Sequence, residues 1–312
     1  MKYPGEIPCV KSTDLPAAID ELARKAWMSL SLAGKDKLFF IGGSGDAPGY
    51  SWTNTHASIR REEDGKLLDV KMPTLLRDIL VRRAGALVGK MFNNSSNVYQ
   101  PWQDGFLQEK RAYKGLAKKN IPALTVVDVD TPYVVTEHLD DLVVFADRLI
   151  EAEPREKVGL LGRAADQLRT LHNAYGAWGD AWMGNFAFHE GVLLALDFEN
   201  APNPLLTERA KRAKDIMNFY LNSVGCCAQG TLPLEDEHEI AVATLEAYNP
   251  SKHLAFSVGV EAVTDSHWLR SHPLQAPLKV ALHHYPVQRL SSPQKVLSAQ
   301  DALYDVIRSE FL

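Results

Sequence analysis

The sequence has few cysteines, no long apolar run and no excess of positive charge. Its three cysteines, two of them adjacent, make a poor disulfide framework and lack the spacing of zinc ligands, so reduced thiols are expected. No run of about 18 apolar residues occurs and the N-terminus lacks a signal-peptide core, which predicts a cytoplasmic protein with no integral membrane segment. A net charge of -5 gives no general attraction to nucleic acid, so no nucleic-acid partner is expected.

What the sequence does have is enough apolar residues for a sizeable core. The 312 residues are 46% hydrophobic, which permits one large domain or two lobes that share a cleft. Apolar periodicity and turn residues predict a mixed first part. Its expected elements are a helix over residues 12–34, strands around 79–92, a helix over 104–119 and a strand hairpin over 123–139.

The pattern changes to helices from about residue 142. Helices are expected over residues 155–176, 205–224 and 235–248, and the short apolar run at 191–196 is expected to be a strand. The division that follows is an N-terminal helical extension over 1–34, an N-lobe over 35–138, and a C-lobe with a C-terminal helical extension over 139–312.

Three polar residues in the second part have the types and the order that phosphoryl transfer requires. Asp180 and Asn185 stand five positions apart in "AWGDAWMGNFAF", the spacing at which a kinase loop carries a catalytic aspartate and a metal-binding asparagine. Asp197 follows the apolar run "GVLLAL", where a carboxylate can reach the same metal ion. An aspartate and an asparagine in a turn are commonly structural, so the prediction depends on the combination of all three.

The first part supplies candidates for a lysine and a glutamate that act together. Lys90 ends the expected strand "GALVGK", and Glu109 lies in the apolar stripe of the helix expected over 104–119. Burial of an unpaired carboxylate is unfavourable, so Glu109 needs a partner, and Lys90 is the candidate. The alternative is that Glu109 lies at the edge of the stripe and Lys90 is a solvated turn residue.

The run "LRTLHNAYGAWGDAWMGNF" with "LLALDFENA" resembles the catalytic segment of the protein-kinase-like superfamily. The likeness is to its compact branches: the lipopolysaccharide-core sugar kinases, the Bud32 type and the aminoglycoside phosphotransferases. It covers about residues 79–222 and implies an α+β, two-lobed fold, with an N-terminal antiparallel sheet lobe, one key helix and a mainly helical C-terminal lobe. By this resemblance Lys90 holds the phosphates of ATP and Glu109 orients it, Asp180 is the catalytic base, Asn185 and Asp197 bind Mg²⁺, and Asp215 supports the catalytic loop from below.

The sequence departs from the family at several positions. Trp178 replaces a histidine whose role is mainly scaffolding, Trp182 replaces the phosphate-contacting lysine of ordinary protein kinases, and only eighteen residues separate Asp197 from Asp215. The glycines of "IGGSGDAPG" (residues 41–49) form either a phosphate-covering loop or an ordinary surface turn. Trp178 and Trp182 either form a stacking platform for a ring or pack under the cleft.

The expected function is an ATP- and Mg²⁺-dependent phosphotransferase. Its expected acceptor is a hydroxyl of a sugar, of a lipid-linked sugar or of another small metabolite, with a protein hydroxyl less favoured. The alternative is a pseudokinase, a nucleotide- or partner-binding scaffold without turnover. The sequence does not specify the acceptor, the oligomeric state or the role of residues 223–312.

Overall fold

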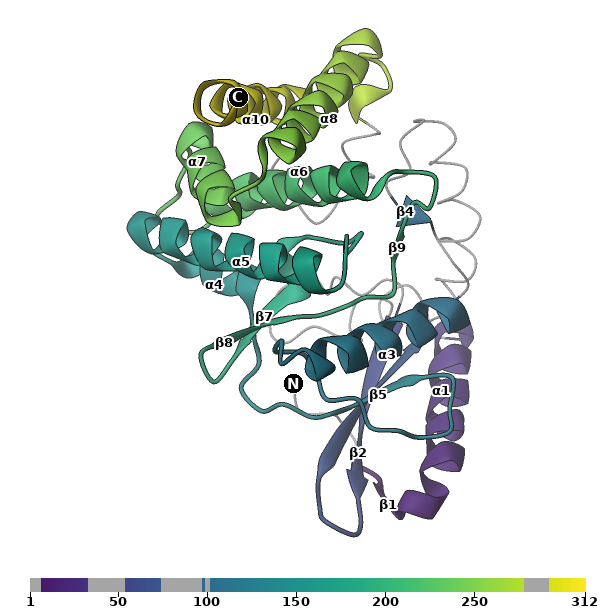
Figure 1. Cartoon of the computed structure of the whole chain (residues 1–312). Coiled ribbons are helices and arrows are strands. Elements are labelled where there is room, and N and C mark those ends of the chain that lie inside the picture. The colour runs from purple at the N-terminus through teal and green to yellow at the C-terminus, as the bar shows by residue number, and fades with distance from the viewer. Residues whose placement is uncertain (1–6, 33–53, 74–96, 99–101, 278–291) are drawn as a thin grey trace. The chain divides into compact units, whose positions relative to one another are not determined.

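The computed structural model describes residues 7–32, 54–73, 97–98, 102–277 and 292–312. The chain divides into two compact units, the first formed by residues 1–95 and 99–140 and the second by residues 96–98 and 141–312. Each unit has its own sheet and its own helices (Figure 1). No helix in the described ranges combines the length and the apolar character needed to cross a bilayer.

Unit 1 is built on a four-stranded sheet with the order β1-β2-β3-β5. Its strands are β1 (Cys9–Val10), β2 (Asn54–Arg61), β3 (Leu67–Pro73) and β5 (Val134–Glu137), and its helices are α1 (Leu15–Leu32) and α3 (Trp102–Lys118). β2, β3 and β5 pair antiparallel, and the two-residue β1 pairs parallel with β2. The hairpin expected over 123–139 is present with a reduced first arm, because Val126 forms only an isolated bridge to Thr136.

The core of unit 1 lies between α1 and one face of the sheet. Leu15 and Ile19 of α1 pack with Leu68 and Val70 of β3 and with Val135 of β5. Successive side chains of a strand point to opposite faces, so β3 presents Leu68 and Val70 to α1 and Lys71 to the other face. The segment predicted as an N-terminal extension therefore packs on the sheet of unit 1.

Unit 2 is mainly helical and contains two small sheets. Its helices are α4 (Phe145–Glu151), α5 (Pro154–Ala174), α6 (Glu208–Cys227), α7 (Glu237–Tyr248), α8 (Lys252–Ser271) and α10 (Pro293–Val306), followed by a π-helical turn at Ile307–Phe311. Its strands are β4 (Asn97–Val98), β6 (Val143–Val144), β7 (Phe186–His189), β8 (Val192–Ala195) and β9 (Ala201–Pro202). β6, β7 and β8 form one sheet, and β4 pairs with β9. α7 packs on α5 and α10, and α6 packs on α8.

The predicted α+β class is confirmed, with a four-stranded N-terminal sheet accompanied by α1 and α3 and a mainly helical remainder. The helices expected from periodicity at 12–34, 104–119, 155–176, 205–224 and 235–248 correspond to α1, α3, α5, α6 and α7. The strands expected at 79–92 and the glycine-rich segment at 41–49 lie outside the described residues. β3 and β7 are among the strands that were not predicted.

A fully buried lysine on α5 is hydrogen-bonded to the end of α6 and to the segment that follows it. Lys157 donates from Nζ to the carbonyl oxygens of Cys227, Gln229 and Leu232, at 3.1, 2.9 and 3.0 Å. These carbonyls lie at and beyond the C-terminus of α6, where helical partners are missing. Lys157 thereby satisfies polar groups that would otherwise be buried without a partner.

The cysteines differ sharply in accessibility, which leads to a labelling prediction. Cys9 is exposed, and burial raises the pKa of the Cys226 and Cys227 thiols to about 12. Because the thiolate is the reactive species, iodoacetamide should alkylate Cys9 alone in the native protein and all three cysteines after unfolding. Mass spectrometry of the native and the urea-unfolded protein measures this. Rapid labelling of Cys226 or Cys227 in the native protein would contradict the buried position of the α6 C-terminus.

Candidate active site

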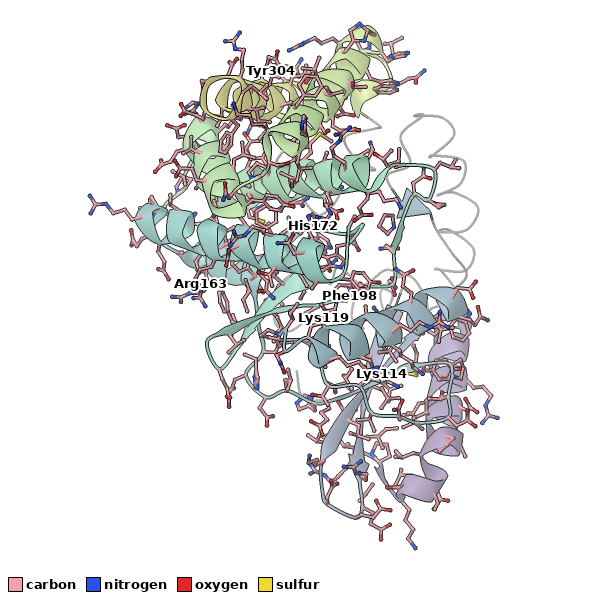
Figure 2. The ribbon with its side chains drawn as sticks, in the orientation of Figure 1. Lys114, Lys119, Arg163, His172, Phe198 and Tyr304 are labelled. Atoms are coloured by element: carbon pink, nitrogen blue, oxygen red, sulfur yellow. The ribbon has the colours of Figure 1, made fainter. Side chains whose placement is uncertain are left out.

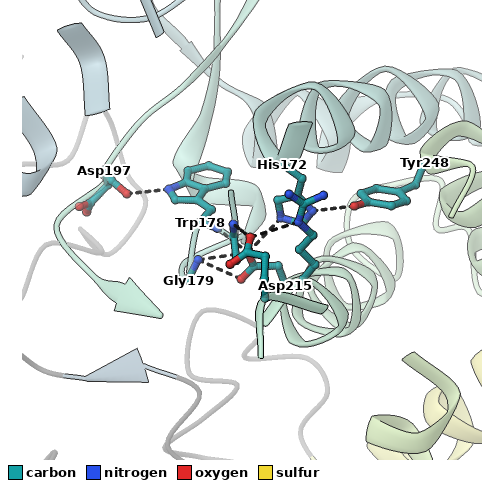
Figure 3. Close-up of polar contacts among 9 residues, drawn as sticks. His172, Trp178, Gly179, Asp197, Asp215 and Tyr248 are labelled. Atoms are coloured by element: carbon teal, nitrogen blue, oxygen red, sulfur yellow. Dashed lines mark hydrogen bonds and ion pairs between the residues drawn. The ribbon is translucent and has the colours of Figure 1, made fainter. Parts of the chain in front are cut away.

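The loop that carries Asp180 follows α5 in the sequence, and its backbone is hydrogen-bonded to a side chain of α6. Asp215 of α6 is almost fully buried and accepts hydrogen bonds from the backbone N–H of Trp178 at 2.6 Å and of Gly179 at 3.0 Å (Figure 3). Nε2 of His172, at the end of α5, lies 3.0 Å from the same carboxylate. Asp215 of α6 therefore joins the end of α5 to the backbone just before Asp180.

His172 extends this network to α7. Its Nδ1 lies 2.7 Å from the hydroxyl of Tyr248, so a ring protonated on Nε2 donates to Asp215 and accepts from Tyr248. Both His172 and Tyr248 are buried. Figure 2 labels His172 at the end of α5, and Figure 3 shows the chain of contacts from Tyr248 through His172 to Asp215. Neither residue was predicted from the sequence.

Trp178 is a scaffold residue and not a binding platform. Its ring is fully buried, stacks on Phe198 at 5.2 Å and meets Phe186 edge-on at 5.0 Å. Its Nε1–H donates to the carbonyl of Asp197 at 3.0 Å. The indole thus packs in the core, and its ring N–H bonds the loop to the segment that carries Asp197.

Trp182 differs from Trp178 because it is only partly buried. Its ring lies so close to Gly184 that a Cβ added at Gly184 would come within 2.2 Å of it. Glycine is therefore required at position 184 for this placement of the indole.

Asn185 and Asp197 are brought together by a hairpin. β7 and β8 pair antiparallel in the register Phe186↔Ala195. The turn between them, Glu190 and Gly191, has two positive φ angles of 49° and 78°, as a tight type I′ turn requires. The register continues past the strands, since the N–H of Leu196 donates to the carbonyl of Asn185 at 2.7 Å. Asn185 therefore lies at the same end of the hairpin as the segment that carries Asp197.

The side-chain amide of Asn185 is oriented by the loop itself. Nδ2 donates to the carbonyl of Asp180 at 3.0 Å, and the N–H of Trp182 donates to the same carbonyl at 2.9 Å. With Nδ2 used in this way, Oδ1 is the atom of Asn185 left to bind a cation. Asp197 has a left-handed backbone with φ of 59°, a conformation that aspartate adopts more readily than most residues.

The carboxylates of Asp180, Asp197 and Glu199 lie close together and make this part of the loop negatively charged. Glu199, nearly fully buried, and Asp197 are both close to Asp180. Burial, followed by the charges of Asp197 and Glu199, raises the pKa of Asp180 to about 7. A carboxyl group with a pKa near neutrality is suited to accept a proton. Oxygen donors of the Asn185 and Asp197 types are those Mg²⁺ prefers, and a divalent cation would offset the repulsion between these carboxylates.

Unit 1 holds a buried lysine–glutamate pair that was not predicted from the sequence. Nζ of Lys71, on β3, lies 2.8 Å from Oε2 of Glu109 on α3, and the two side chains are only 8% and 3% exposed. The hydroxyl of Tyr113 donates to Oε1 of Glu109 at 2.9 Å. The ammonium of Lys71 also lies 5.7 Å from the centre of the Phe106 ring. Lys90, the partner expected for Glu109, lies outside the described residues.

Comparison with known proteins adds little to this geometry. No family model matches the sequence, and no curated protein matches it. Among solved structures, the chain is similar to a MAP kinase from Leishmania major, with 17% identity over 90% of this chain and 91% of that one and a TM-score of 0.30. It is also similar to Cex1p, with 15% identity over 89% of this chain and 51% of that one and a TM-score of 0.26. TM-scores this low do not establish a common fold, so the site rests on the contacts described above.

Proposed function

We propose that the protein is an ATP- and Mg²⁺-dependent phosphotransferase. The observation that carries this proposal is the loop of Asp180, in which Asp215 fixes the backbone and Asn185 is bonded to the Asp180 carbonyl at one end of the β7–β8 hairpin. A carboxylate, an amide and a second carboxylate in this order are the groups that phosphoryl transfer uses.

In the proposed step Asp180 acts as the general base. The O–H bond of the acceptor hydroxyl breaks and its proton passes to the Asp180 carboxylate, while the hydroxyl oxygen bonds to the γ-phosphorus of ATP. The bond between the γ-phosphorus and the β–γ bridging oxygen breaks, and ADP leaves with that electron pair. Asn185 and Asp197 would hold Mg²⁺, which would neutralise charge on the phosphates.

Lys71 and Glu109 would serve the nucleotide in this proposal. Catalysis in kinases requires a strand lysine paired with a helix glutamate, and Lys71 with Glu109 has this chemistry and this placement on a strand and a helix. We therefore assign to Lys71 the role that the sequence analysis gave to Lys90.

The proposed acceptor is a hydroxyl of a sugar, of a lipid-linked sugar or of another small metabolite. α6 begins at Glu208, soon after Asp197, which leaves a short segment where regulated protein kinases have a long activation segment. Docking of a peptide acceptor is correspondingly less favoured. A cytoplasmic location and the lack of a nucleic-acid partner belong to the same proposal.

Nucleotide binding tests the proposal without knowledge of the acceptor. ATP with Mg²⁺ should raise the melting temperature in a concentration-dependent way, because a ligand that binds only the folded state stabilises it. Asn185→Ala should weaken this shift. Equal melting temperatures with and without Mg²⁺-ATP would contradict the proposal.

Substitution of Lys71 tests the lysine assignment. Lys71→Arg keeps the charge next to Glu109 but cannot reproduce the compact ammonium group, so ATP turnover should fall about 10²-fold or more. Lys66→Arg is the matched control, since Lys66 lies just before β3, is 55% exposed and pairs with Glu137. Turnover is measured as ADP formed in the presence of Mg²⁺. A wild-type rate in Lys71→Arg would remove Lys71 from the site.

A further inference from the structure

Asn200 makes a direct contact with the carboxylate of Asp180 that no role described above explains. Its Nδ2 donates to Oδ2 of Asp180 at 2.8 Å. The amide must present its nitrogen here, because its oxygen would meet the carboxylate as a second acceptor. One of the two Asp180 carboxylate oxygens is thereby engaged by a neutral donor.

The chain places Asn200 at this point through a close backbone approach. Gly179, next to Asp180, has φ of 90°, and a Cβ there would lie 3.0 Å from the nitrogen of Pro202 and 3.1 Å from the carbonyl oxygen of Asn200. A side chain at position 179 would therefore push the segment that carries Asn200 away from the loop. The glycine before Asp180 permits both the turn of the loop and the contact with Asn200.

The backbone on the C-terminal side of Asn200 belongs to a two-stranded sheet. β9 begins at the next residue and pairs antiparallel with β4 in the register Ala201↔Val98 and Pro202↔Asn97. On its N-terminal side, the carbonyl of Asp197 accepts the Nε1–H of Trp178. The backbone is thus hydrogen-bonded on both sides of Asn200, which limits where its amide can lie.

We infer that Asn200 is a positioning residue, which holds Asp180 through Oδ2 and leaves Oδ1 as the oxygen that takes the acceptor proton. A carboxylate free to rotate about its side-chain bonds would present either oxygen, and only one arrangement is productive. A hydrogen bond to a charged group is strong enough to select one arrangement. This inference rests on the proposed function, because it concerns the base of that reaction.

Two variants and one control test the inference kinetically. Asn200→Ala removes the donor, and Asn200→Asp replaces it with a carboxylate of the same size. In both, kcat for Mg²⁺-dependent ATP turnover should fall about 10- to 100-fold with the KM for ATP little changed. Asn203→Ala is the control, since Asn203 lies in the same segment and its Oδ1 accepts from the N–H of Leu205. A purely structural role would instead lower the melting temperature and raise the KM.

Side-chain amide NMR tests the contact independently of turnover. The Asn200 amide signal is identified by its loss in Asn200→Ala, and it should shift in Asp180→Ala. An unshifted signal would overturn the contact, and wild-type kcat in both Asn200 variants would overturn the positioning role. If the wild-type protein does not turn over ATP, the proposed function is wrong, and the Asn200–Asp180 contact then has no catalytic role.

Discussion

Asp180→Asn is expected to lower Mg²⁺-dependent ATP turnover by about 10²- to 10⁴-fold, the range associated with loss of a general base. The amide cannot accept the acceptor's proton, but its oxygen can still accept from Asn200, so the loop should keep its conformation. Binding of Mg²⁺-ATP should therefore persist. Steady-state kinetics together with titration calorimetry separate these two effects.

The same variant should be more stable than the wild type in metal-free buffer. The pKa of Asp180 rises from an ordinary carboxyl value of 3.8 to about 7 on folding, so its ionisation opposes folding. Below the unfolded-state pKa, Asp180 is protonated in both states and the wild type keeps its full stability. That stability is lost progressively as the pH rises from there through about 7, the pKa of Asp180 in the folded protein. The melting temperature of Asp180→Asn should thus increasingly exceed that of the wild type between these two values. An advantage that shrinks with rising pH would contradict the partly buried position of Asp180 close to Asp197 and Glu199.

Asp215→Ala is expected to reduce the free energy of unfolding by about 3 to 5 kcal/mol, because several buried donors lose their acceptor at once. The N–H groups of Trp178 and Gly179 and the ring of His172 would lose their acceptor in a buried environment. ATP turnover should fall as well, because these groups fix the backbone that leads into Asp180. Urea denaturation measures the stability loss.

An exposed aspartate provides the control for Asp215. Asp305 on α10 is 60% exposed and only loosely paired with Arg308 at 3.5 Å. Asp305→Ala should change stability by no more than about 0.5 kcal/mol. A loss below about 1 kcal/mol in Asp215→Ala would show that water or other groups replace the carboxylate, contrary to its burial.

Local patterns in the sequence predicted the parts of this molecule that depend on neighbours along the chain. The apolar stripes of α3, α5 and α6 repeat at helical spacing, so these helices were found close to their ends. Asp180 and Asn185 could be placed in one loop for the same reason, since both residues lie within one short segment, and their catalytic roles stay a prediction. The position of Asp197 after a short apolar strand also followed from local order.

Contacts between segments that are distant in the sequence could not be predicted from local patterns. Lys71 and Glu109 are 38 residues apart, and no periodicity relates them. The available signal was a lysine between Val70 and Met72 in an alternating run, which places it on the opposite face of a strand from the core. The prediction of Lys90 rests on its place at the end of an apolar run, and it stays a prediction.

The residues around Asp180 show the same limit. His172 and Tyr248 are 76 residues apart, and Asn200 reaches Asp180 only because the backbone at Gly179 admits Pro202 so closely. Neither fact follows from composition or spacing. The burial of Trp178 likewise depends on Phe186 and Phe198, which come from either side of the β7–β8 hairpin.

The most direct test of phosphotransferase activity is transfer of the γ-phosphate of radiolabelled ATP to a panel of hydroxyl acceptors in the presence of Mg²⁺. The panel includes free sugars, lipid-linked sugars and small alcohol metabolites. We expect the wild type to form ADP and a labelled product with at least one acceptor, and Asp180→Asn to form neither at a comparable rate. Binding of Mg²⁺-ATP without formation of ADP or labelled product with any acceptor would contradict the account and identify the protein as a pseudokinase.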